Sequence, residues 1–416
     1  MQKRFFGSDL VELYENIKKR SKKFGGYYMF YEPIFVPTDL ELIKKILVSD
    51  FNHFTDRISH VDDRNDPLSA NILFLKGNKW REVRQLLRPS FSSKTIKMGI
   101  PKLNDQYFDV KKVLDKYNID LIGSVLLDVE CNALICEYSE IEKHIHAVLQ
   151  TSILSTVARL LTLLPLIKKY IKIPLFNKKV STFFIDFVKK HTNMSNGVIQ
   201  NLIPLSVNER AANAAMMFLA GYDTTSNTTS FCLYELALHP RLQDNIRSEI
   251  SSVLEKHGGV LNQETLTDLE LLEKCLRETL RKYPVSTAIT RTCVETYHVP
   301  DSDIIIEKGS KVYIPVRAVH WDADLYPNPE LFNPERFTEM EIRKRHPTAW
   351  IPFSDGFRHC IGHKLAKISM KFLLAQLLNN YSFTLHPDTK HLLEYDPKSY
   401  LLQAKDNIKL RAVKLN

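Results

Sequence analysis

The densest group of chemically capable side chains lies in the ten residues from Phe353 to Gly362, FSDGFRHCIG. Gly356 and Gly362 bracket Arg358 and Cys360, just before an apolar helical pattern. Glycine permits backbone conformations and close approaches that other residues forbid. A thiol at a helix N-terminus beside a guanidinium is expected to have a lowered pKa. We therefore predict a thiolate that acts either as a nucleophile or as a metal ligand.

Two other interpretations of Cys360 stay open at this point. A buried structural cysteine would suit an apolar environment, and a zinc site is an option because His359 and His363 flank the thiol. Zinc is disfavoured, since no second ligand pair follows at the usual spacing. The sequence also lacks Gly-x-Gly-x-x-Gly, the phosphate loop, His-Glu-x-x-His and Gly-x-Ser-x-Gly. These common nucleotide-binding and catalytic motifs are therefore not indicated.

The remaining cysteines are dispersed and form no Cys-x-x-Cys pair. In a chain of this length they do not indicate a disulfide framework. We predict that all five are small buried hydrophobic residues. They are Cys131, Cys136, Cys232, Cys275 and Cys293.

A long helix is predicted to begin at Ser206 and to end at His239, before Pro240. Glu209 stands three residues after Ser206, which is the spacing of a capping box. At 1.5 Å per residue such a helix would measure roughly 50 Å and cross a whole domain.

The middle of this helix holds a second candidate site, Ala220-Gly221-Tyr222-Asp223-Thr224-Thr225. A glycine inside a helix costs roughly 1 kcal/mol relative to alanine, so it needs a reason. The Thr224 hydroxyl can bond the Ala220 carbonyl four residues back and bend the helix. We expect a groove beside Gly221, with Asp223 and Thr224 at its edge. The alternative is a solvated acid and alcohol on a helix surface.

A further helix is predicted to begin at Thr267, with Glu270 as its capping-box partner, and to end before Pro284. Glu278 and Arg281 lie three residues apart on one face of it. That face lies largely opposite the leucine stripe, so spacing alone predicts a surface ion pair worth a few tenths of a kcal/mol.

The elements around these residues indicate a mainly α fold with small β-sheet pieces towards the two ends of the chain. A third helix follows Cys360 and runs to about Asn379, with a deeply buried last half. No alternating β-α-β series appears, which disfavours a doubly wound nucleotide fold. The other predicted elements are a hairpin over 27–36, a short helix over 39–48, and strands over 311–316, 381–385 and 408–413.

Composition is that of a globular protein. The 416 residues are 44% hydrophobic and 25% charged, and the formal net charge is +9. We find no linker that divides the chain, so one domain over residues 1–416 is predicted. The basic excess is spread along the chain, which makes nucleic acid a weaker candidate partner than anionic lipid or an acidic protein. No run reaches the roughly 18 uncharged apolar residues of a bilayer span; the nearest is 153–167.

The pattern Phe-x-x-Gly-x-Arg-x-Cys-x-Gly resembles the haem-binding loop of the cytochrome P-450 superfamily, the haem-thiolate monooxygenases. Further segments resemble the family's motifs in the same order, and the likeness covers most of the chain. They are Trp80-Arg81-Glu82-Val83-Arg84, Ala220 to Thr225, Glu278-x-x-Arg281, Arg291 and Asn333-Pro334-Glu335-Arg336-Phe337. The chain looks most similar to microsomal, detoxification-type members.

The resemblance implies a role for each matching residue. Cys360 would be the axial ligand of the haem iron, and Asp223 and Thr224 would relay protons to dioxygen. Glu278, Arg281 and Arg336 would form a structural network near the haem loop. Trp80 and Arg84, which share a helix face, would bind the haem propionates together with Arg291 and Arg358. The implied haem-binding residues are Trp80, Arg84, Ala220, Gly221, Arg291, Phe353, Gly356, Arg358, Cys360 and Gly362.

The function implied is a monooxygenase that inserts one atom of dioxygen into an apolar organic substrate. Electrons would come from a separate NADPH-dependent flavoprotein reductase, which would dock on the basic face formed by Arg81, Arg88, Lys364 and Lys367. The substrate pocket is expected to include Phe74, Met216, Met217, Val285 and Ala288. The location implied is the cytoplasmic face of the endoplasmic reticulum membrane. We expect a peripheral contact there through the apolar run 153–167, followed by Lys168, Lys169 and Lys172.

The sequence departs from the family in two places. Microsomal relatives begin with a membrane anchor and a Pro-rich hinge, and this chain begins after both. Between Val188 and Ser206 the family has more helical sequence, so a deletion and an uncovered apolar surface are expected there. The alternative function is therefore a non-catalytic haem-binding protein. A haem-thiolate isomerase or dehydratase is disfavoured by the intact Asp223-Thr224 pair.

Overall fold

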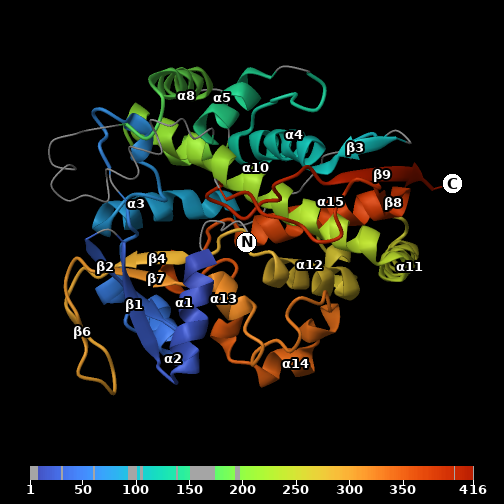
Figure 1. Ribbon diagram of the computed structural model, residues 1–416. Helices are drawn as coiled ribbons and strands as arrows, with labels where there is room; N and C mark the ends of the chain where they lie inside the picture. The colour runs from blue at the N-terminus through green and yellow to red at the C-terminus, as the bar shows by residue number, and fades with distance from the viewer. Residues whose placement is uncertain are drawn as a thin grey trace.

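A computed structural model describes residues 8–29, 31–59, 61–91, 101–103, 106–136, 139–149, 174–192, 197–397 and 399–415. Its larger part is a stack of helices, and a smaller part is built around a four-stranded sheet (Figure 1). The predicted helix-rich fold is thereby confirmed. The candidate membrane segment 153–167 and the lysines after it lie outside the described residues.

The α-helices of the described residues are α1 (Ser8–Lys19), α2 (Leu40–Lys44), α3 (Gly77–Leu87), α4 (Val110–Ile122), α5 (Glu140–Leu149), α8 (Lys178–His191), α9 (Val198–Asn201), α10 (Val207–Leu238), α11 (Pro240–Lys256), α12 (Glu270–Lys282), α13 (Val316–His320), α14 (Glu339–Lys344) and α15 (His363–Asn380). The strands are β1 (Phe24–Met29), β2 (Glu32–Pro37), β3 (Tyr107–Asp109), β4 (Ile289–Thr292), β5 (Tyr297–His298), β6 (Ile305–Ile306), β7 (Lys311–Ile314), β8 (Tyr381–Leu385) and β9 (Lys409–Lys414).

The strands join segments that are distant in sequence. One sheet has the order β1-β2-β7-β4, and another has the order β3-β9-β8. The predicted hairpin exists as the antiparallel pair β1 and β2, but Glu32 and Pro33 belong to β2 and not to the turn. The register of β4 against β7 pairs Arg291 with Val312, which fixes the position of one candidate haem-binding residue.

Helix α10 is the longest helix of the described residues and crosses the molecule in Figure 1. The predicted capping box at Ser206 and Glu209 is present. The first half of the helix packs in a core with α3, α4 and α8, and the second half packs in another core with α11, α12 and α15. Because both cores share this helix, a group held between α10 and the loop before α15 lies at the centre of the protein.

The second predicted capping box is wrong. The chain at 265–268 forms a separate 3-10 turn, and α12 begins at Glu270 after Leu269, whose side chain cannot cap. Glu249 takes over the role, because its carboxylate accepts hydrogen bonds from the backbone N–H groups of Leu271 (2.6 Å) and Leu272 (3.1 Å). A cap supplied by another helix leaves no local sequence pattern.

The segment before α10 is better covered than its sequence suggests. Helix α8 continues to His191, and the apolar side chains of Val198, Ile199 and Leu202 are fully buried. Ile203 is 45% exposed. The expected uncovered surface is therefore limited, in the described part of this segment, to that side chain.

Two of the cysteines also differ from expectation. Cys232, Cys275 and Cys293 are buried as predicted, but Cys131 is half-buried and Cys136 is exposed. The latter two lie in the irregular chain between α4 and α5, where no helix face determines burial.

Candidate functional site

The loop from Phe353 to Gly362 has a fixed conformation. Ser354 and Gly356 both have a positive φ, at 62° and 69°. The Cys360 N–H donates to the Phe353 carbonyl at 2.9 Å, which closes the loop on itself. The thiol is thereby presented on a rigid turn directly ahead of α15.

Gly356 is required by a close approach as well as by its φ. A Cβ at this position would lie 1.9 Å from the Leu47 carbonyl oxygen of the helical turn at Lys45–Ser49. Gly362 is different, because a Cβ there would be in ordinary contact with Phe91 at 3.5 Å. The loop is therefore locked at its first glycine by packing against the N-terminal part of the chain.

The pKa of the Cys360 thiol is raised and not lowered as predicted. Burial raises the pKa of this thiol, and the Gly362 N–H, Arg57 and Arg84 only oppose that rise. The desolvation of the thiolate outweighs the neighbouring positive charges. The zinc alternative also finds no support, since no group of three metal-ligating side chains occurs among the described residues.

Arginines surround the Cys360 loop and hold its backbone. The Arg84 guanidinium on α3 donates to the His359 carbonyl at 2.9 Å, and Arg57 donates to the Arg358 carbonyl at 3.1 Å. Arg57 belongs to no motif and was not predicted. It lies in an irregular segment whose sequence gives no periodic signal.

Arg291 and Arg358 are both buried, and each donates hydrogen bonds to uncharged oxygen atoms. Arg291 donates to the Thr290 carbonyl (2.9 Å) and to the Ser354 hydroxyl (3.2 Å), and its Nε has no hydrogen-bond partner among the described residues. Arg291 is 0% exposed and is therefore not a solvated surface charge.

Arg358 is held between elements of the N-terminal half. It donates to the carbonyls of Thr55 and Leu75, both at 2.8 Å, and one terminal nitrogen has no hydrogen-bond partner in the part of the chain that the structure describes. Its guanidinium lies 3.9 Å from the centre of the Trp80 ring, which Arg84 also approaches at 5.7 Å. The predicted pair of Trp80 and Arg84 on one face of α3 is therefore present.

Arg57, Arg84, Arg291 and Arg358 form a positive cluster in which a bound anion would be favourable. Burial lowers the pKa of Arg57. Burial and repulsion from neighbouring arginines lower the pKa of Arg84 and Arg291, and lower that of Arg358 to about 9. Asp56 lies 3.7 Å from Arg358. Haem carries two propionates, which would supply the missing negative charge and accept the unmade hydrogen bonds. The residues present fit a haem.

The centre of α10 differs partly from the predicted groove. The Thr224 hydroxyl donates to the Ala220 carbonyl at 2.6 Å, as expected. Gly221 has another reason to be glycine, because a Cβ there would lie 2.4 Å from the Ile122 side chain of α4. Asp223 turns to α4 as well, with its carboxylate 2.8 Å from the Lys111 ammonium. Asp223 and Thr224 therefore do not lie together at the edge of one groove, contrary to the prediction.

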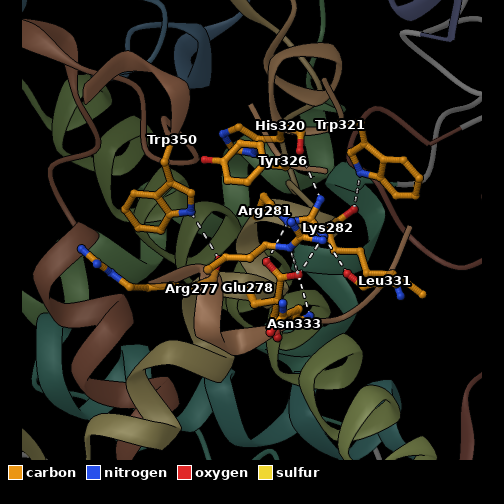
Figure 2. A network of polar contacts seen from close by, with 12 residues as sticks. Arg277, Glu278, Arg281, Lys282, His320, Trp321, Tyr326, Leu331, Asn333 and Trp350 are labelled. Atoms are coloured by element: carbon orange, nitrogen blue, oxygen red, sulfur yellow. Dashed lines mark hydrogen bonds and ion pairs between the residues drawn. The ribbon is translucent and has the colours of Figure 1, made fainter. Parts of the chain in front are cut away.

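Glu278 and Arg281 form a buried network and not a surface pair (Figure 2). Both residues are 0% exposed. The Glu278 carboxylate accepts hydrogen bonds from Arg281 at 2.7 and 2.8 Å and from the Asn333 N–H at 2.9 Å, with Arg336 at 3.4 Å. Arg281 also donates to the His320 carbonyl at 3.1 Å. The helix face opposite the leucine stripe is covered by the 316–337 segment, which the helical wheel of α12 cannot reveal.

The predicted substrate residues are only partly brought together. Phe74, Met216 and Met217 belong to one apolar cluster, beside the first half of α10. Val285 and Ala288 lie before β4, and Ala288 packs in a different cluster. Ala288 therefore packs against residues of the sheet and not in the apolar cluster beside α10.

An open groove of about 330 Å³ runs along α3 on the side of the Cys360 loop. Arg81 and Arg88 are exposed there, and Phe357 is 64% exposed. The groove thus combines positive charge with an aromatic side chain. Its lining consists of Phe51, Asn52, Trp80, Arg81, Arg84, Gln85, Arg88 and Phe357.

Comparison with known proteins places the chain in a family. The cytochrome P450 family model matches residues 3–412. A probable cytochrome P450 6a13 of Drosophila melanogaster is 34% identical, over 94% of this chain and 85% of the relative. Cytochrome P450 6a2 of the same insect is 30% identical (97% and 89%), and cytochrome P450 6j1 of Blattella germanica is 31% identical (100% and 89%).

The chain belongs to the cytochrome P450 family, whose members are haem monooxygenases. The family binds haem iron through a cysteine thiolate. It uses dioxygen, an organic substrate and a redox partner. Among the residues that the structure describes, no helix is both long enough and apolar enough to cross a membrane.

Proposed function

We propose that this protein inserts one atom of dioxygen into an apolar organic substrate, with electrons from a separate NADPH-dependent flavoprotein reductase. The observation that carries the proposal is the cluster of four buried or half-buried arginines around the Cys360 loop. Buried positive charges that lie close together repel one another, and an anion among them would offset that repulsion.

Cys360 is the proposed axial ligand, on a loop that Gly356 and two arginines hold rigid. Bound haem supplies the iron at which dioxygen is activated, and a thiolate ligand favours cleavage of the O–O bond. Arg84, Arg291 and Trp80 are assigned to the propionates, and Arg57 joins them because it faces the same thiol. A cysteine that ligates iron would do so as the thiolate, so the raised pKa of Cys360 would apply to the chain before haem binds.

Thr224 is the proposed proton donor on the α10 side. Its hydroxyl donates a hydrogen bond to the Ala220 carbonyl at 2.6 Å. The lone pairs of the hydroxyl oxygen can still accept a proton from another group. Asp223, the next residue, is the proposed source of that proton. Removing a positioned acid or base typically slows a reaction by about 10²–10⁴-fold.

The substrate is proposed to be apolar because Phe74, Met216 and Met217 gather in one apolar cluster against α10. Methionine and phenylalanine offer no hydrogen bond to a substrate, and methionine adapts its shape to different ligands. This favours a substrate held by burial of its surface.

The groove beside α3 is the proposed dock for the reductase. Arg81, Arg88 and Lys364 are exposed and suit an acidic partner. Lys367 contributes less than predicted, because it is half-buried and lies 3.9 Å from Glu273.

The protein is further proposed to lie on the cytoplasmic face of the endoplasmic reticulum membrane. The support is the basic, apolar composition of 153–172. Co-sedimentation with anionic vesicles that decreases as salt rises is expected. Sedimentation unaffected by Glu substitutions at Lys168, Lys169 and Lys172 would contradict a contact through this segment.

The experiment that tests the proposal combines the haem-loaded chain, the reductase, NADPH and an apolar probe substrate under isotope-labelled dioxygen. One labelled oxygen atom per product molecule is expected. A chain that is fully loaded with haem and reduced by the reductase, yet forms no oxygenated product from a broad probe panel, would instead favour the non-catalytic haem-binding protein.

A further inference from the structure

A compact group of charges lies between α4 and α10, on the side of α10 that faces α4. The Lys111 ammonium is 2.9 and 2.8 Å from the two carboxylate oxygens of Asp115, and 2.8 Å from Oδ1 of Asp223. The Asp223 side chain is 7% exposed, that of Asp115 is 10% exposed and that of Lys111 is 28% exposed. The group therefore leads from the interior of α10 towards solvent.

This group carries more negative than positive charge. One ammonium stands between two carboxylates, so the fully ionised set has a net charge of −1 in a buried place. Burial raises the pKa of Asp115, and Asp223 adds to the rise. The two carboxylates outweigh the effect of burial on Lys111 and raise its pKa, so the lysine stays an ammonium. One additional proton on the carboxylates would neutralise the group.

Among the described residues, the neighbouring side chains do not supply that charge, and the hydrogen bond that Asn227 donates to Oδ1 of Asp223 at 3.0 Å is a neutral one. On α10, the Tyr222 ring lies 5.9 Å from the Lys111 ammonium, and its fully buried hydroxyl has no hydrogen-bond partner among the described residues. On α5, Glu142 adds negative charge near Tyr222 and is paired with Lys116 (3.9 Å) and His146 (3.6 Å).

The two carboxylates are close enough to exchange a proton. Two oxygens that each lie 2.8 Å from the same nitrogen are at most twice that distance apart. One water molecule bridges such a gap. Transfer between two carboxylates is close to balanced in free energy, whereas a lysine with a raised pKa is a poor donor.

We propose that Asp115 is the solvent-side proton entry for Asp223, and that Lys111 is the positioning residue that holds the two carboxylates together. Asp115 takes a proton from solvent and passes it to Asp223, after which Asp115 is again a carboxylate. Lys111 keeps its three protons throughout. This inference rests on the proposed role of Asp223 and Thr224 in proton delivery, and it extends that role to α4.

The test compares Asp115→Asn, Lys111→Met and Lys111→Arg with Lys112→Met, a matched control for an exposed lysine of α4. We expect Asp115→Asn and Lys111→Met to lower the ratio of product to consumed NADPH by up to about 10²-fold, the lower end for a positioned proton-transfer group. The solvent deuterium isotope effect on product formation should rise in both. Lys111→Arg should restore most of the ratio, and Lys112→Met should change neither quantity.

A second readout needs no turnover. Infrared difference spectra between acid and neutral pH, recorded in an Asp66→Asn background because Asp66 also takes up a proton in this range, should show a protonated buried carboxyl that disappears in Asp115→Asn. If that band persists in Asp115→Asn, or if Asp115→Asn keeps the wild-type ratio and isotope effect, the proposal is overturned.

Thr224→Ala separates this failure from failure of the proposed function. When Thr224→Ala loses product but Asp115→Asn does not, proton delivery by α10 stands and the entry through α4 is wrong. When neither variant loses product, the proton-delivery role itself is wrong, and the inference that rests on it is overturned too.

Discussion

Replacing Glu278 by Gln should reveal how strongly the network in Figure 2 ties α12 to the 316–337 segment. The side chain keeps its shape but loses its charge. Arg281 then loses the carboxylate that accepted its hydrogen bonds at 2.7 and 2.8 Å, and Arg336 loses its ion pair at 3.4 Å. The new amide NH₂ would also point donors at donors, because a guanidinium accepts no hydrogen bond.

The magnitude follows from burial. Breaking a buried pair by removing one partner costs about 3–5 kcal/mol, since an uncompensated charge remains. Three donors lose their acceptor or share a weaker one, so we expect a loss at the upper part of this range. Against a typical stability of about 5–15 kcal/mol, the variant should unfold at clearly lower denaturant concentration.

The assay is urea unfolding followed by tryptophan fluorescence. Trp321 and Trp350 report on the same region, since their indole N–H groups donate to the carbonyls of Lys282 and Arg277. Glu339→Gln is the control, because Glu339 pairs with Arg343 on the exposed helix α14 and should have no measurable effect. A change for Glu278→Gln as small as that of the control would refute the reasoning and restore the surface-pair interpretation.

Three further predictions concern the site and its surroundings. Thr224→Ala should keep haem binding but release peroxide in place of product; an unchanged ratio of product to NADPH would count against a proton role. The double charge reversal Arg81→Glu and Arg88→Glu should raise the reductase concentration needed for half-maximal rate, without changing the haem spectrum. High salt should raise the same concentration for the wild-type protein, because salt screens the attraction between the two surfaces. Burial raises the pKa of Asp66 to about 6. Its ordinary value is lower, so the folded state binds the extra proton, and stability should fall as pH rises from about 4 to 6. Asp66→Asn should remove that fall, and parallel curves of unfolding free energy against pH for both proteins would disprove it.

The local parts of the fold could be predicted because their signals are local. Ser206 and Glu209 are close in sequence, and the cap they form depends on nothing else. The Thr224 hydroxyl likewise reaches a carbonyl of its own helix. Gly356 was recognised as special from its type, although its contact with the Leu47 carbonyl could not be known.

The parts that failed depend on distant segments. Glu278 looked exposed because the residues that bury it come from 316–337, and Glu249 caps α12 from another helix. Arg57 has no neighbours in sequence that mark it as part of a site. The pKa of Cys360 was misjudged because helix position and charge were considered without the depth of burial.

The most direct measurement of the central claim is the absorption spectrum of the purified chain, reduced and bound to carbon monoxide. Haem held by a Cys360 thiolate predicts the long-wavelength Soret band of thiolate ligation, and loss of that band in Cys360→Ala. A wild-type spectrum of the kind given by histidine-ligated haem, or a thiolate band that survives in Cys360→Ala, would contradict the account.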